Sequence, residues 1–293
     1  MCSSDLACYR PLKGYRGRGG KLTYDRRSAT LPEQKTVPCG KCIGCRLDRS
    51  RDWAIRCAHE ASLHSKNSFL TLTYAPENLP RGGSLEPKHL QNFMKYLRAA
   101  AASGNHSTTV RFFACGEYGS KLSRPHYHIV LFGYDFPDKT PWQNHRGNQL
   151  FRSPELERLW PKGFSTIGEV NWQSAAYTAR YIMKKISGDD ADDHYDGKVP
   201  EFTRCSLRPG IGHGWIERYW RDVSPLDQVV IIRDGQAKQY KPPRYYDKWL
   251  QEHQPDIFEE VWRKRVMNAK AKERELTELR SEENAKQYAV DRR

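Results

Sequence analysis

The chain has 293 residues, enough for one well-filled core with terminal additions, and this length argues against two equal domains. Its formal charge is +14 and 12% of its residues are aromatic, a mixture that suits unpaired nucleic acid because charges follow phosphates and rings stack on bases. The alternative is a basic protein that only avoids self-association. Since no signal peptide or membrane-length apolar run is present, we expect a cytoplasmic protein without a membrane partner, whose eight cysteines are not in disulfides.

The N-terminal segment, 1–46, combines a basic stretch with a cysteine run. Residues 9–36 are rich in Gly, Arg, Lys and Tyr, which predicts a flexible basic arm with at most one irregular hairpin. Cys39, Cys42 and Cys45 then form an overlapping Cys-x-x-Cys-x-x-Cys run with intervening glycines. This spacing predicts a zinc knuckle that lacks one ligand.

Three other cysteines are candidates for the fourth ligand. Cys8 and Cys2 are nearest, and Cys57 on the following helix is the third; we take Cys8 as the first choice. An iron–sulfur cluster and free thiols remain alternatives. A structural zinc ion would attach the arm to the rest of the protein, so its removal would destabilise the fold.

The next part of the chain predicts helices packed on strands. Apolar spacing indicates helices over 47–64 and 86–102, and a β-branched and aromatic run indicates a strand over 69–74, with a turn-rich loop over 76–87. Helices over one face of an antiparallel sheet give an α+β domain.

Two further strands carry metal-ligand side chains. Residues 110–119 end in a Gly-Glu-Tyr-Gly turn containing Glu117, and a short polar connection leads to the strand 125–132. His126 and His128 lie two residues apart and therefore share one face of that strand. In an antiparallel hairpin Glu117 lies near their level, and two imidazoles with a carboxylate suit a catalytic divalent ion. Taken singly, these residues are equally typical of satisfied histidines and a surface carboxylate.

Beyond this hairpin the sequence predicts a polar loop over 134–147, a short helix over 154–160 and a strand over 164–170. A helix over 172–185 follows, with Asn171 as its N-cap. Tyr177 and Tyr181 then lie one turn apart on one face, and Lys184 and Lys185 follow in the next turn. Tyrosines at this spacing are otherwise ordinary packing residues.

The C-terminal third offers weaker patterns. We expect the acidic cluster after 188 to form a solvated loop, although it could supply a further carboxylate to the metal. Residues 199–208 and 229–232 are predicted as strands, 213–221 as a helix, 241–246 as a basic aromatic turn that meets DNA or packs internally, and the region from 255 as a charged, solvated or partner-binding helix. There is no Walker-type loop, so no nucleotide cofactor is expected.

Three stretches in this order resemble the HUH endonucleases, and more closely the rolling-circle replication initiators of microvirus-type phages (gokushovirus-like). They are Gly116-Glu117-Tyr118-Gly119, Arg124-Pro125-His126-Tyr127-His128 and 176–185, preceded by the strand 69–74. The resemblance covers about 37–188, and a Pro-Cys-Gly-Lys-Cys run is shared as well. It implies an α+β fold, a central antiparallel sheet of the RRM-like palm type with flanking helices, a Cys-rich zinc-knuckle-like extension and a helical tail. The expected organisation is 1–46 arm, 47–188 endonuclease domain, 189–254 accessory elements and 255–293 tail.

The resemblance also implies an activity. Mg²⁺ or Mn²⁺ held by His126, His128 and Glu117 would orient a phosphodiester of single-stranded origin DNA. Tyr177 or Tyr181 would attack it, leaving a 5′-phosphotyrosine and a 3′ hydroxyl primer. A phenol with a pKa of about 10 needs a nearby cation, for which Lys184 and Lys185 are suited. We favour Tyr181 first, because Lys184 follows it by one turn.

Partners follow from the same resemblance. Host helicase and DNA polymerase would extend the primer in the bacterial cytoplasm. Two alternatives stay open: a related HUH relaxase or transposase, which is disfavoured because relaxases often carry their tyrosines before the histidine strand, and a non-enzymatic zinc-dependent nucleic-acid-binding protein.

Overall fold

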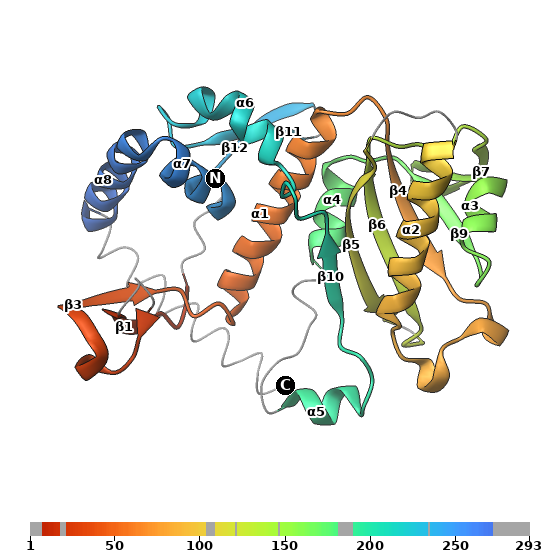
Figure 1. Cartoon of the computed structure of the whole chain (residues 1–293), viewed down its shortest axis with the longest axis horizontal. Helices are drawn as coiled ribbons and strands as arrows, with labels where there is room; N and C mark the ends of the chain where they lie inside the picture. The colour runs from red at the N-terminus through yellow and green to blue at the C-terminus, as the bar shows by residue number, and fades with distance from the viewer. Residues whose placement is uncertain are drawn as a thin grey trace. The chain divides into compact units, whose positions relative to one another are not determined.

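The structure is a computed structural model that describes residues 8–17, 22–103, 109–120, 122–145, 147–180, 190–233 and 235–271. The chain divides into two compact units (Figure 1): Met1–Arg49 with Asp256–Arg293 form the smaller one, and Ser50–Pro255 form the larger one. Helix α1 (Ile43–Ser62) contributes residues to both. Within the described ranges, no helix combines the length and apolarity needed to cross a membrane.

The larger unit is built on a seven-stranded sheet in the order β10-β5-β6-β4-β9-β8-β7. Every pairing in it is antiparallel, which confirms the predicted α+β class with a central antiparallel sheet. Its strands are β4 (Asn67–Thr73), β5 (Arg111–Tyr118), β6 (Pro125–Phe132), β7 (Thr140–His145), β8 (Asn148–Arg152), β9 (Ser165–Gly168) and β10 (Phe202–Cys205).

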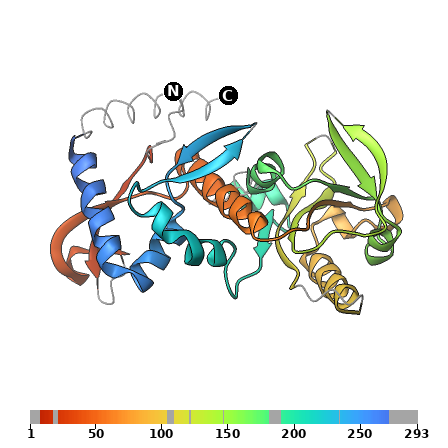
Figure 2. The same ribbon diagram turned by 90° about the horizontal axis from the view of Figure 1, so that it is seen from above.

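Helices cover both faces of the sheet, as Figures 1 and 2 show. On one face, Tyr127, Ile129 and Leu131 of β6 join a core with helix α2 (Pro87–Ser103) and α3 (Pro154–Leu159). On the other face, Val130 and Phe132 pack with α1 and α4 (Trp172–Arg180). Side chains alternate along a strand, so His126 and His128 lie on the α4 face.

The predicted loop over 134–147 is wrong in part, because β7 pairs with β8 as a hairpin at the edge of the sheet. All six residues of β7 are exposed, so its sequence lacks the apolar alternation by which a half-buried strand is recognised. Gly147 in the turn has φ +81°, a conformation that glycine adopts readily.

The acidic cluster is also not a loop: α5 (Asp190–Tyr195) is a short helix, whose start is favoured by negative charge near the helix N-terminus. Asp189 lies outside the described residues. The remaining elements of this unit are α6 (His213–Val223), β11 (Val229–Arg233), β12 (Gln236–Tyr240) and α7 (Arg244–His253), and β11 and β12 form a two-stranded hairpin.

Residues 241–246, offered as a turn that meets DNA or packs internally, belong to the packing. Helix α7 begins at Arg244, and Tyr246 is fully buried with its ring stacked 5.7 Å from that of Trp215. The predicted DNA contact by Tyr246 is therefore wrong, because its ring has no exposed face.

The smaller unit contains a three-stranded antiparallel sheet in the order β2-β1-β3 and the helix α8 (Pro255–Ala271). Its strands are β1 (Leu12–Gly17), β2 (Leu22–Thr23) and β3 (Ala29–Val37). The expected irregular hairpin is present as β1 and β3, whose register shifts between Tyr15 and Gly17. The described part of 9–36 is thus a sheet and not a flexible arm. Its pairing gives order that its Gly-rich composition does not indicate.

Candidate metal centre

The β5–β6 hairpin brings the three predicted metal ligands together. Glu117 and His126 are register partners, and His128 lies two residues further along β6 on the same face. The Nε2 atoms of His126 and His128 lie 2.7 Å and 3.2 Å from Oε1 of Glu117. One ligand atom from each residue lies within 4.8 Å of the other two, a spacing that suits a single ion.

Both imidazoles are oriented through their Nδ1 atoms. Nδ1 of His126 lies 3.1 Å from the Arg124 carbonyl oxygen, which only accepts, so Nδ1 donates there. Nδ1 of His128 lies 3.1 Å from the Thr71 hydroxyl oxygen. In neutral His126 the Nε2 lone pair then faces a carboxylate oxygen, and so close an approach requires a proton or a cation between them. The donor set therefore fits a divalent cation.

Glu117 is buried, with 2% of its surface exposed. Burial by itself raises the pKa of this carboxyl, but hydrogen bonds from His126 and His128, together with their charge, outweigh it and lower the pKa to about 2. The side chain is therefore ionised at neutral pH, as a metal-binding carboxylate must be.

Phe69 on β4 holds the second imidazole in place. Its ring is nearly parallel to that of His128, with centres 5.6 Å apart and planes 5° apart. Because Phe69 and Thr71 are two residues apart on one strand, one packs on the ring while the other hydrogen-bonds to it. The His128 ring is thereby restrained in two directions.

Helix α4 places Tyr177 beside this cluster. The helix begins with a reciprocal cap, in which the Asn171 side-chain oxygen accepts from the Ser174 N–H at 2.8 Å and the Ser174 hydroxyl accepts from the Asn171 N–H at 2.9 Å. This confirms Asn171 as the N-cap. Ala175 and Ala179 are fully buried against β5 and β6, and their small side chains allow a close approach of helix and sheet.

The Tyr177 ring centre lies 5.0 Å from that of His128, with the planes 83° apart. The side chain is 39% exposed, so the phenol borders the candidate metal centre and remains accessible. Tyr181, Lys184 and Lys185, the other predicted catalytic residues, lie outside the described residues.

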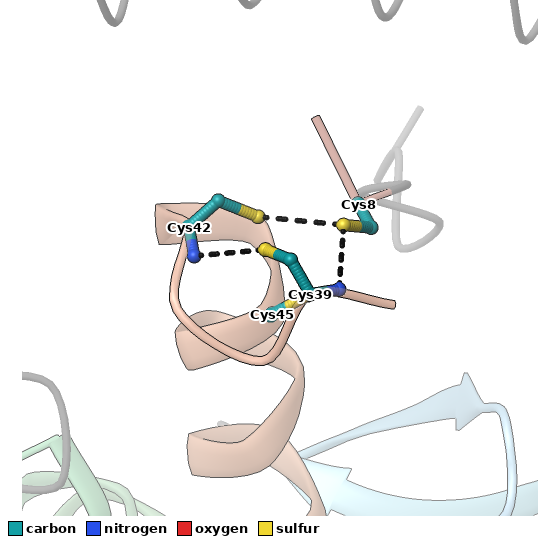
Figure 3. A group of neighbouring side chains, drawn as sticks. All are labelled: Cys8, Cys39, Cys42 and Cys45. Carbon is teal, nitrogen blue, oxygen red and sulfur yellow. Dashed lines mark hydrogen bonds between the residues drawn. The ribbon is translucent and has the colours of Figure 1, made fainter. Parts of the chain in front are cut away.

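A second cluster lies in the smaller unit (Figure 3). The sulfur atoms of Cys8, Cys39, Cys42 and Cys45 lie within 4.8 Å of one another. The Cys39 N–H donates to Sγ of Cys8 at 3.2 Å, and the Cys42 N–H donates to Sγ of Cys39 at 3.3 Å. Four sulfurs supported by backbone N–H groups form a donor set that fits tetrahedral zinc.

The other candidates for the fourth ligand do not join this cluster. Cys57 is fully buried in α1 and packs with Phe113 and Val130 in the core of the larger unit. Cys2 lies outside the described residues.

Comparison with known proteins decides the family. Residues 67–186 match the model of the replication-associated protein ORF2 family. The chain is 34% identical over 273 residues to the replication-associated protein ORF2 of Spiroplasma virus 4, an alignment covering 86% of this chain and 83% of that protein. The chain belongs to this family of replication-associated proteins.

Two phage relatives extend the comparison. The replication-associated protein VP4 of Bdellovibrio phage phiMH2K is 32% identical over 282 residues, covering 94% of this chain and 86% of the relative. The replication-associated protein ORF4 of Chlamydia phage 1 is 29% identical over 220 residues, covering 73% and 53%. No solved structure matches the chain significantly. The match 67–186 includes Glu117, both histidines and Tyr177, and leaves out the cysteine run.

Sequence reasoning missed the groups that orient the ligands: Phe69, Thr71 and the Arg124 carbonyl. The alternation of Phe69 and Thr71 along one strand was the only available signal. Which face they share with His128 depends on the β4–β6 register, in which Thr71 pairs with His128.

Proposed function

We propose that this protein nicks and rejoins single-stranded DNA at a replication origin and thereby initiates rolling-circle replication of a small single-stranded DNA phage genome. The observation that carries the proposal is the position of Tyr177, whose ring lies 5.0 Å from that of His128 within the Glu117, His126 and His128 cluster. Membership of the replication-associated family supports it, since the phage relatives bear that name.

Glu117, His126 and His128 would hold Mg²⁺ or Mn²⁺. A divalent cation bound there would polarise the non-bridging oxygens of the scissile phosphate. The protein contributes the orientation of the ligands: the Arg124 carbonyl and the Thr71 hydroxyl fix the two imidazoles, and burial keeps competing water from the Glu117 carboxylate.

The nucleophile would be the phenol oxygen of Tyr177 or Tyr181. It forms a bond to phosphorus while the bond from phosphorus to the 3′ oxygen breaks. The phenol proton is lost to solvent, and the departing 3′ oxygen gains a proton to become a hydroxyl. Lys184 or Lys185 would favour the phenolate form of the attacking tyrosine through its positive charge.

The products would be a 5′-phosphotyrosine and a free 3′ hydroxyl. Attack of a 3′ hydroxyl on the phosphotyrosine reverses the reaction and rejoins the strand without a nucleotide cofactor. A second tyrosine one turn along the helix would cut the regenerated origin while the first remains esterified. Host helicase and DNA polymerase would act on the primer in the bacterial cytoplasm.

The cysteine cluster would hold a structural Zn²⁺ through Cys8, Cys39, Cys42 and Cys45. Three of these residues lie within seven positions where β3 gives way to α1, and the fourth precedes β1, so one ion would join the start of this unit to the start of α1. This arrangement also favours a second candidate function, a zinc-dependent nucleic-acid-binding protein without catalysis.

Cleavage of a pool of single-stranded oligonucleotides from the parent replicon separates the two functions. With Mg²⁺ or Mn²⁺, the nickase forms a protein–DNA adduct that survives denaturing electrophoresis. Tyr177→Phe and Tyr181→Phe should each retain part of this activity, and the double variant should lose it. Salt-sensitive binding without cleavage or adduct would instead support the non-enzymatic binder.

A further inference from the structure

An exposed aromatic pair lies near the edge of the sheet, on β7 and just before β9. The rings of Trp142 and Phe164 have centres 5.0 Å apart and planes 63° apart, and their side chains are 46% and 39% exposed. The guanidinium carbon of Arg152 lies 4.4 Å from the Phe164 ring centre and 5.9 Å from that of Trp142. These three residues form one cluster, which we call the aromatic platform.

Strand register places the platform at the level of the candidate metal centre. Thr73 is the register partner of His126, and both its N–H and its hydroxyl donate to the Phe164 carbonyl at 2.9 Å. Phe164 therefore lies two strand spacings, about 10 Å, from His126 across the sheet.

The platform also lies on the same face as the metal centre. Ile167 of β9 packs into the α2-side core, and Phe164 precedes it by an odd number of residues, so its side chain points to the opposite face. Phe151 of β8 packs on the α2 side as well, which places its neighbour Arg152 on the other face. His126 and His128 share that face.

Core packing does not explain the aromatic pair. Strand β7 is the edge strand and all six of its residues are exposed, so Trp142 covers little of the core. Nη2 of Arg152 is held 2.6 Å from Oε1 of Glu157, which fixes the guanidinium over the Phe164 ring. Large rings exposed together and held in place are typical of a surface that a partner covers.

We infer that Trp142, Phe164 and Arg152 form a stacking site for an unpaired base of the DNA strand whose phosphate lies at the metal centre. The inference rests on the proposed function. The occupant follows from the chemistry, because stacked rings with a guanidinium bind nucleobases of any sequence, and the chain's +14 charge attracts the phosphates on either side. A site for phosphate alone would require no exposed rings.

Fluorescence anisotropy with a fluorescein-labelled oligothymidylate, without added Mg²⁺ or Mn²⁺, measures this contact separately from cleavage. Trp142→Ala should weaken binding about 5-fold to 100-fold, the range expected for loss of one base–aromatic stack. Trp142→Phe keeps a ring and should bind nearly as the wild type does. Tyr96→Ala is the matched control, because Tyr96 is an exposed aromatic residue on α2, which covers the other face.

An abasic oligomer of the same length provides the second arm, since the difference between wild type and Trp142→Ala should vanish on a probe without bases. Photo-crosslinking of wild-type protein to an iodouracil-containing oligomer should label the peptide with Trp142 or that with Phe164, and needs no variant to fold.

Equal affinity of Trp142→Ala and wild type, or crosslinks only to other peptides, would overturn the platform even if nicking is observed. Weakened binding by Trp142→Ala with no covalent adduct from wild type would reject the nickase and leave the platform as a binding site.

Discussion

At the residue scale, the geometry of the candidate metal centre depends on side chains that are not ligands. Thr71 is the clearest case, because its hydroxyl is 3.1 Å from Nδ1 of His128 and so fixes which nitrogen faces Glu117. Outer hydrogen bonds of this kind orient the imidazole and tune its basicity.

Replacement Thr71→Val should lower Mn²⁺ affinity about 10-fold to 100-fold, since the ring loses its orienting partner at nearly constant side-chain volume. Thr71→Ser retains the hydroxyl and should stay close to wild type. Isothermal titration calorimetry with Mn²⁺ measures both. Wild-type affinity in the valine variant would show that Phe69 stacking alone holds His128.

His59 of α1 gives a residue-level prediction on pH. Its ring lies against Trp215, with centres 3.5 Å apart, and burial lowers its pKa to about 3. In the unfolded chain the pKa is about 6.5, so between these values only the unfolded chain takes up the proton. Stability should therefore fall as pH drops from about 6.5 toward 3.

Urea unfolding of the larger unit at about pH 7.5 and about pH 5 measures this loss. His59→Phe removes the titrating group and retains a ring against Trp215, so its unfolding midpoint should change less between the two pH values. An unchanged pH dependence in that variant would assign the effect to other groups.

At the scale of elements, the approach of α4 to the sheet sets the distance from Tyr177 to the histidines. Ala179 is fully buried against β5 and β6, and a larger side chain there has no space. Ala179→Leu should cost about 1–3 kcal/mol and displace the helix. The yield of covalent adduct should fall while Mn²⁺ binding persists, because the ligands lie on the strands.

The matched variant Gln173→Leu changes an exposed position of the same helix and should keep the adduct yield. Parallel measurement of adduct by denaturing gel and of Mn²⁺ binding by calorimetry separates displacement of α4 from damage to the metal centre. Loss of both in Ala179→Leu would instead indicate that the whole unit is disturbed.

The second element-scale prediction concerns the start of α1 and the segment before β1, which Cys45 and Cys8 would link through a metal ion. Cys42→Ser should abolish bound zinc and lower the melting temperature of the smaller unit, since metal binding contributes directly to folding. Elemental analysis and thermal unfolding measure this. Cys57→Ala is the control, because Cys57 lies outside the cluster and should leave the zinc content unchanged.

At the scale of the whole molecule, strong local patterns predicted the parts that surround the site. The β5–β6 hairpin was predictable because Glu117 and the His126 strand are separated by a short polar connection. The α2 helix was predictable because Leu90, Phe93 and Leu97 repeat at helical spacing, and all three are buried.

Other parts could not be predicted because their order comes from pairing. Strand β7 is exposed along its length and carries no apolar alternation, and β12 is defined by its partner β11. The Thr71–His128 contact depends on register between strands more than 50 residues apart, about which the sequence of either strand is silent.

The most direct test of the central claim is peptide mapping by mass spectrometry of wild-type protein incubated with origin-region single-stranded DNA and Mg²⁺, beside His126→Ala and His128→Ala. The account predicts a nucleotide 5′-phosphate on Tyr177 or Tyr181 in the wild type and none in either histidine variant. A covalent adduct on any other residue, or cleavage that survives loss of both histidines, would contradict it.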